Sequence, residues 1–192
     1  MGLLSREALL AMGFAAVGDD VRISDRASFY GCERISLGNH VRIDDFCVLS
    51  AGSGGIRLGN FIHIAVQSSL IGAGTIALAD FCNISSRVSI FSSSDDYSGC
   101  HMTNPMVPAR YTGVHSAPVQ LGKHVIVGSG SVVLPGVTLH EGVAVGALSL
   151  VPKDCEAFGI YAGSPARRVK ERRRDLLDLE RQLRNDMNVT GS

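Results

Sequence analysis

The chain has 192 residues, 45% of them hydrophobic and 19% charged, so it can bury a folded core and carries too few charges for a disordered protein. Its 18 basic and 18 acidic residues cancel, and no apolar run approaches the roughly 20 residues that cross a bilayer, which argues against nucleic-acid binding and against membrane insertion. Five cysteines without C-x-x-C spacing argue against a disulfide framework and a zinc knuckle, and they are typical of a reducing cytoplasm.

The first expected element is a short helical cap within residues 1–16. Ser5 can cap a helix over the helix-forming residues that follow it, as far as Phe14. A stack of repeats also needs its ends covered, and this helix lies next to the start of a repeat.

From Val17 to Val151 an apolar residue recurs at every sixth position. These residues are Val17, Ile23, Phe29, Leu37, Ile43, Leu49, Leu58, Ile64, Leu70, Leu78, Ile84, Ile90, Leu121, Val127, Val133, Leu139, Val145 and Val151. The steps from 29 to 37, 49 to 58 and 70 to 78 exceed six by 2, 3 and 2 residues, and the step from 90 to 121 exceeds it by 25. Each extra stretch therefore follows a third repeat.

This pattern predicts a prism with three sides per coil. A period of six does not fit the 3.6 residues of a helical turn, and the alternation and hairpin turns of an open sheet are missing. Eighteen sides make six coils, and all of the extra residues leave at one corner. We expect this domain to span residues 17–165, with one long loop at residues 91–120.

The last element is predicted to be a helix and tail within residues 166–192. Val169, Leu176, Leu179, Leu183 and Met187 fall on one helical stripe, with charged residues elsewhere. The helix is expected to pack on the prism or on a neighbouring subunit.

The repeat resembles the hexapeptide signature of left-handed parallel β-helix acyltransferases over roughly residues 17–170. Its closing segment, VPKDCEAFGIYAGSPARRVK, is similar to the end of the coenzyme-A-dependent sugar and xenobiotic O- and N-acetyltransferases, which contains the phrase G-x-P-A-R-x-V/I. The resemblance implies an all-β, left-handed parallel β-helix and a cytoplasmic acetyltransferase that uses acetyl-CoA and no metal. It also implies a homotrimer with active sites between subunits.

The long interruption, SIFSSSDDYSGCHMTNPMVPARY, departs from that family at its central position. Where the sugar acetyltransferases have a catalytic histidine, this chain has Asp95, followed by Asp96; the nearest histidine is His101. A hydroxyl nucleophile needs a base such as histidine, whereas a neutral amine attacks a thioester unaided and needs only a group that takes its proton or holds it in place. Asp95 and Asp96 therefore favour N-acetylation, unless they form only a solvated turn.

Other outward-facing residues are candidates for the acceptor sugar. His63 and Asn83 alternate with buried positions, and Gln67 matches a polar position that contacts the acceptor in the resembling family. Tyr97 lies in the interruption. His63 and His115 are further candidates for a base, whereas His124 and His140 fall at corners and are expected to be merely exposed.

The resemblance also places the coenzyme along the last coils. Small residues at Ser129 and Ala147 allow pantetheine to approach the backbone. Its phosphates require cations, and the matching basic residues are Lys153, Arg167, Arg168 and Lys170.

Three other functions are compatible with the same fold. An O-acetyltransferase acting on a sugar hydroxyl or a small antibiotic would use His101 as its base. The γ-type carbonic anhydrases share the fold but need an H-x-x-x-x-H pair of zinc ligands, and no two of the six histidines are five apart. A non-catalytic trimeric scaffold would not need the polar interruption.

Within acetyl transfer, the interruption is most similar to enzymes of bacterial surface-polysaccharide pathways that act on nucleotide-linked amino sugars such as perosamine. The identity of the sugar, and whether it is nucleotide-linked, lipid-linked or free, stays open.

Overall fold

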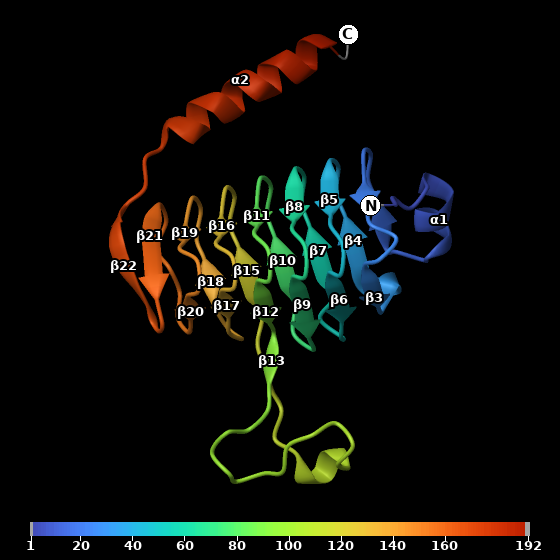
Figure 1. The fold of residues 1–192 in the computed structure, drawn as a ribbon, viewed down its shortest axis with the longest axis vertical. Helices are drawn as coiled ribbons and strands as arrows, with labels where there is room; N and C mark the ends of the chain where they lie inside the picture. Colours follow the sequence, from blue (N-terminus) through green and yellow to red (C-terminus); the bar gives the residue numbers. More distant parts are fainter. Residues whose placement is uncertain (1, 191–192) are drawn as a thin grey trace.

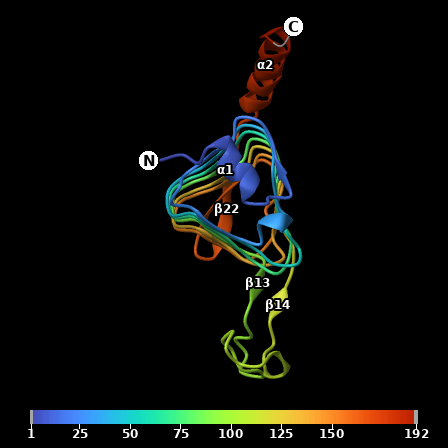
Figure 2. The same cartoon turned by 90° about the vertical axis from the view of Figure 1, so that its right-hand side faces the viewer.

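The computed structural model of the protein describes residues 2–190, and it is a three-sided prism of stacked coils (Figures 1 and 2). Each coil contributes one strand to each of three parallel sheets. The first sheet contains β1 (Ala16–Val17), β4 (Ile35–Leu37), β7 (Ile56–Leu58), β10 (Ile76–Leu78), β15 (Val119–Leu121) and β18 (Thr138–Leu139). The second contains β2 (Arg22–Ile23), β5 (Val41–Ile43), β8 (Ile62–Ile64), β11 (Asn83–Ile84), β16 (Ile126–Val127) and β19 (Ala144–Val145). The third contains β3 (Ser28–Tyr30), β6 (Val48–Ala51), β9 (Ser69–Gly72), β12 (Ser89–Phe91), β17 (Val132–Val133) and β20 (Leu150–Val151).

All eighteen residues of the period-six series lie on these strands, one to a strand, so the six coils and their three sides are as predicted. We call the bend from the first sheet to the second the first corner, the bend from the second to the third the second corner, and the return to the first sheet the third corner. The extra residues, including the 3-10 turn at Cys32–Arg34, all leave at the third corner.

The repeat continues beyond the six coils. Cys155 bridges to Leu139 on the first sheet, and β21 (Gly159–Gly163) pairs with β19 on the second, which begins a seventh turn. β22 (Ala166–Glu171) then returns antiparallel to β21. Residues 166–171 are therefore strand, and the helix expected from Val169 begins only at Asp175 as α2 (Asp175–Thr190).

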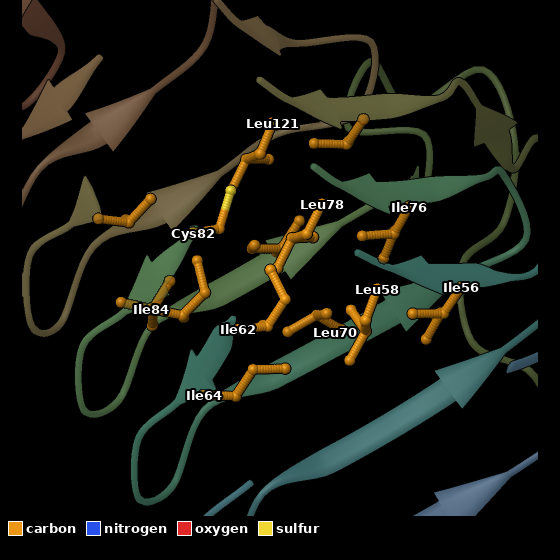
Figure 3. Close-up of a cluster of buried hydrophobic side chains, with 14 of the residues drawn as sticks. Ile56, Leu58, Ile62, Ile64, Leu70, Ile76, Leu78, Cys82, Ile84 and Leu121 are labelled. Atoms are coloured by element: carbon orange, nitrogen blue, oxygen red, sulfur yellow. The ribbon is translucent and has the colours of Figure 1, made fainter. Parts of the chain in front are cut away.

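The inward side chains form one continuous core (Figure 3). Equivalent residues of successive coils stack directly, as Leu58, Leu78 and Leu121 do in the first sheet. Each fully buried aliphatic side chain contributes about 1.5–3 kcal/mol relative to an exposed one. Cys47 and Cys82 belong to this core, and burial raises the pKa of the Cys82 thiol to about 12.

Two helices lie outside the prism. α1 (Arg6–Ala11) sits at the amino-terminal end, where the Ala8 amide donates to Ser5 Oγ at 3.1 Å and Leu9 is buried (Figure 1). α2 runs outside the first corner (Figure 2). The first corner carries four stacked rings, His40, Phe61, Phe81 and His124, with ring centroids 4.6, 4.8 and 4.9 Å apart along the series.

Candidate active site

The long loop leaves the third corner as a two-stranded ribbon that projects away from the prism (Figures 1 and 2). Its strands are β13 (Ser93–Ser94) and β14 (His115–Ser116), which pair antiparallel, and a 3-10 turn at Ala109–Tyr111 lies near its tip. The ribbon follows directly from β12, so Asp95 and Asp96 stand where the ribbon widens into its tip.

Asp96 organises the tip of the ribbon. Its carboxylate accepts hydrogen bonds from the Ser98 amide at 2.7 Å, from the His101 amide at 2.9 Å and from His101 Nδ1 at 3.0 Å. The bonds from Ser98, and then those from His101, hold the pKa of Asp96 well below its ordinary range. With the proton of a neutral His101 ring on Nδ1, facing the carboxylate, Nε2 is left as a hydrogen-bond acceptor.

Asp95 is placed differently. It is exposed, and its carboxylate makes no hydrogen bond or ion pair to any residue that the structure describes. It lies at the edge of an open groove of about 600 Å³ on the outer side of the third sheet, floored by Phe91, Val132 and Leu150. Tyr97, with 93% of its surface exposed, lines the same groove. Asp95 is thus a free carboxylate beside an apolar surface.

The outer side of the second sheet holds another group of the predicted residues. His63 and Asn83 are neighbours in register on β8 and β11. His63 Nε2 lies 2.9 Å from Asp44 Oδ2, and burial of Asp44 is outweighed by its hydrogen bonds from His63 and Arg42, which lower its pKa. Gln67 is exposed at the second corner with φ of +61°.

Ser129 and Ala147 occupy the second corner in successive coils, joined by a hydrogen bond from the Leu148 amide to the Ser129 carbonyl at 2.8 Å. Gln67 lies at this same corner two coils earlier. The polar candidate Gln67 and the proposed pantetheine positions therefore share one edge of the prism.

The basic residues gather at the carboxyl-terminal end. Lys153, Arg167 and Arg168 line one open pocket of about 390 Å³, together with Tyr161 and Ala166. Lys170 follows on β22, paired in register with Ile160. Arg168 is also bonded to Glu171, whereas Lys153 and Lys170 have no acidic partner among residues 2–187.

Within one chain the predicted site residues form three separate groups: the ribbon, the second sheet with its corner, and the basic end. His115 lies with Asp96, Cys100 and His101 around a shallow pocket on the ribbon. His140 is exposed, as expected. His124 is not: its side chain is only 10% exposed, because Glu180 of α2 covers it.

Sequence reasoning gave no role to Glu180, Arg87 or Ser85. The first is revealed only by a contact across 56 residues.

Within residues 2–190, no helix is both long and apolar enough to cross a bilayer. Nor do the described side chains include a group of three or more His, Cys, Asp or Glu residues arranged to hold a metal ion.

The chain is similar in sequence and in structure to known acyltransferases. The chain is 59% identical over 180 residues to the dTDP-4-amino-4,6-dideoxy-D-glucose acyltransferase of Escherichia coli, covering 94% of both chains. It is 42% identical to AntD, an N-acyltransferase from Bacillus cereus, in a crystal structure with dTDP and 3-hydroxybutyryl-CoA, with a TM-score of 0.93 over 97% of this chain and 98% of that one. A galactoside acetyltransferase bound to coenzyme A, 22% identical with a TM-score of 0.61 over 86% of this chain and 69% of that one, shares the fold. No family model matches the chain. These matches confirm the left-handed β-helix.

Proposed function

The chain belongs to the hexapeptide-repeat acyltransferase family, and from that premise we propose that it transfers the acetyl group of acetyl-CoA to the amino group of a nucleotide-linked 4-amino-4,6-dideoxyhexose. The E. coli relative is named for such an acceptor, and AntD has been crystallised with dTDP-4-amino-4,6-dideoxyglucose and coenzyme A. The observation that carries the proposal is Asp95, a free carboxylate at the edge of the groove. It occupies the sequence position at which the resembling sugar acetyltransferases have a histidine.

Asp95 suits the chemistry of an amine. In its neutral form the sugar amine attacks the thioester carbonyl carbon, a C–N bond forms, and the nitrogen of the tetrahedral adduct becomes strongly acidic. Asp95 accepts the proton from that nitrogen. The C–S bond then breaks, and coenzyme A leaves as a thiolate that takes up a proton. The amide product and the free thiol balance the reaction.

One feature of the AntD structures supports this assignment. Their subjects include variants in which one aspartate or one serine was substituted, at positions ten residues apart. Ser85 and Asp95 have the same separation in this chain, as do Ser86 and Asp96. Of the two aspartates, Asp96 is already engaged by the ribbon, so we assign proton transfer to Asp95 and the positioning of His101 to Asp96.

The pair formed by Asp96 and His101 supports one second candidate. A histidine that donates Nδ1–H to a carboxylate keeps Nε2 available as a general base, which is the arrangement that a hydroxyl acceptor requires. O-acetylation of a sugar hydroxyl is therefore the alternative, with His101 as the base.

We propose that the coenzyme lies along the second corner and ends at the basic pocket. Ser129 and Ala147 would face pantetheine, and Lys153, Arg167, Arg168 and Lys170 would neutralise the phosphates. The AntD and galactoside acetyltransferase structures contain coenzyme A or an acyl-CoA, and they share this fold.

We further propose a homotrimer with each site between subunits. The three groups of site residues lie on separate parts of one chain, so a neighbour is needed to bring the ribbon to the second corner of another chain. The ribbon tip also exposes apolar side chains that suit a contact: Tyr97, Met102, Met106, Tyr111 and Val114. Light scattering is expected to give three times the 20.3 kDa chain mass.

The five free thiols agree with a reducing cytoplasm, where nucleotide-linked sugars for surface polysaccharide would be the substrates. The test compares free-thiol release from acetyl-CoA with two matched acceptors, a dTDP-linked 4-amino-4,6-dideoxyhexose and its 4-hydroxy counterpart. Turnover of the amine alone is expected. Turnover of the hydroxyl compound instead would replace N-acetylation by O-acetylation with His101 as base.

A further inference from the structure

Arg87 is an exposed cation without a counter-ion. Its guanidinium makes no hydrogen bond or ion pair to any described residue. Arginines in the first two coils and before them behave differently, since each lies beside a carboxylate: Arg6, Arg22, Arg26, Arg34 and Arg42. Because most charged side chains of this protein lie beside an opposite charge, an arginine without such a partner is a candidate to bind an anion from outside the chain.

The backbone fixes Arg87 at the second corner, in the fourth coil. Its φ of +59° belongs to the left-handed turn that the second to sixth coils make there, and its amide donates to the Val66 carbonyl at 3.0 Å. One coil later, the Gly130 amide donates to the Ser86 carbonyl at 3.0 Å. Arg87 therefore stands between Gln67 in the third coil and Ser129 in the fifth.

The surroundings of Arg87 suit an anion. The turns of the third to sixth coils at this corner contain no acidic residue: residues 65–68, 85–87, 128–130 and 146–149. Ser85, Ser86 and Ser129 add hydroxyl groups that can donate to an oxyanion. The corner position equivalent to Arg87 in the next coil is Gly130, which has no side chain.

We infer that Arg87 binds the diphosphate of the nucleotide-linked acceptor. A guanidinium presents a fork of N–H donors that matches phosphate oxygens, and its charge offsets that of a nucleotide diphosphate. The coenzyme phosphates are served elsewhere, by the basic pocket beyond the sixth coil. Ser85, the serine that lies ten residues before Asp95, is two residues from Arg87. The sugar and its diphosphate would therefore contact the same turn of the chain. This inference rests on the proposed function.

The experiment compares Arg87→Met and Arg87→Lys with wild type in the intact oligomer. Arg57→Met is the matched control, because Arg57 is also unpaired among the described residues but lies on the outer side of the first sheet. Titration calorimetry with dTDP is expected to show affinity reduced at least about tenfold by Arg87→Met, less by Arg87→Lys, and unchanged in the control. The KM for acetyl-CoA should not change, and thermal melts of all variants should coincide.

Two outcomes would overturn the inference, and they are distinguishable. If wild type acetylates the nucleotide amino sugar and Arg87→Met binds dTDP as tightly as wild type, the diphosphate lies elsewhere and the proposed function stands. If wild type neither binds dTDP nor uses a nucleotide-linked amine, the proposed function fails and the role of Arg87 fails with it.

Discussion

His124 Nε2 and Glu180 Oε2 lie 2.6 Å apart, and this contact joins α2 to the fifth coil. Lys123 Nζ also donates to both Glu180 oxygens, at 2.8 and 3.0 Å, and Arg184 Nε donates to Oε1 at 2.7 Å. Burial disfavours the charged carboxylate, but these hydrogen bonds outweigh it and lower the pKa of Glu180 from 4.5 to about 2. α2 is thus held to the prism by a polar contact, while Leu179 stays exposed.

Replacement of this carboxylate is expected to release α2. Glu180→Gln keeps the shape of the side chain and removes its charge. We expect it to lower the free energy of unfolding by on the order of 2 kcal/mol and to allow rapid proteolysis within α2. Because the folded-state pKa is lowered, the stabilisation is present above pH 4.5 and is lost as the pH falls toward 2. Chemical denaturation at pH 7 and pH 3 measures both effects. If Glu180→Gln and the exposed helix variant Asp178→Asn lowered the free energy of unfolding equally, Glu180 would not be the residue that holds α2 to the prism.

Asp95→Asn is expected to reduce kcat for the amine acceptor by about 100-fold, because the amide cannot accept the proton that general-base catalysis removes. The KM for acetyl-CoA should change little, since the coenzyme is bound elsewhere. Steady-state thiol release with Asp178→Asn as the control tests this. Full activity in Asp95→Asn would exclude Asp95 as the proton acceptor.

Asp96→Asn is expected to act through the ribbon. It should lower kcat less than Asp95→Asn and make residues 97–114 more sensitive to protease, because the carboxylate holds both Ser98 and His101. Its pKa is lowered from 3.8, so the contact is intact above about pH 4 and weakens as the pH falls below that value. His101→Ala should also reduce kcat less than Asp95→Asn. Loss of all activity in His101→Ala, with both aspartate variants fully active, would show that the histidine is the base.

The basic pocket is expected to set the affinity for the coenzyme. Lys153→Met and Arg167→Met should each raise the KM for acetyl-CoA about three- to tenfold and leave the KM for the acceptor unchanged. Added salt should shrink the difference, because the exposed contacts are screened. Arg173→Met, which loses only a surface pair with Asp175, is the control. An unchanged KM in both pocket variants would place the phosphates elsewhere.

The prism was predictable from the sequence because most inward positions are enclosed by the coils above and below them. Ile64, Ile84 and Val127 leave no alternative to an apolar residue, so the period is visible without any alignment. The seventh turn was missed, since the step from Val151 to Cys155 is four residues instead of six, and its two positions, Cys155 and Tyr161, are not aliphatic. Likewise Val169 fits the helical stripe but lies in β22, at the register shift between the Tyr161–Arg168 and Ile160–Lys170 pairs, because β21 offers β22 a free edge.

The site was less predictable. Asp96 is followed two residues later by Ser98, a spacing typical of an Asx turn, so its local role was visible in principle. The burial of His124 was not, because it depends on Glu180, far along the chain. Nor does any local pattern show that Arg87 lacks a partner, since that requires knowing every residue brought to its corner.

The stacked coils have one further consequence for the substrates. Each coil adds one interstrand spacing, about 4.8 Å, along the prism. Arg87, Ser129 and Ala147 lie at the same corner in three consecutive coils, so the sites proposed for the acceptor diphosphate and for pantetheine are separated by whole steps of that length. The distance between two such positions is therefore fixed by the number of coils between them. A point substitution can change which group a coil binds, but only the gain or loss of a whole coil can change that distance.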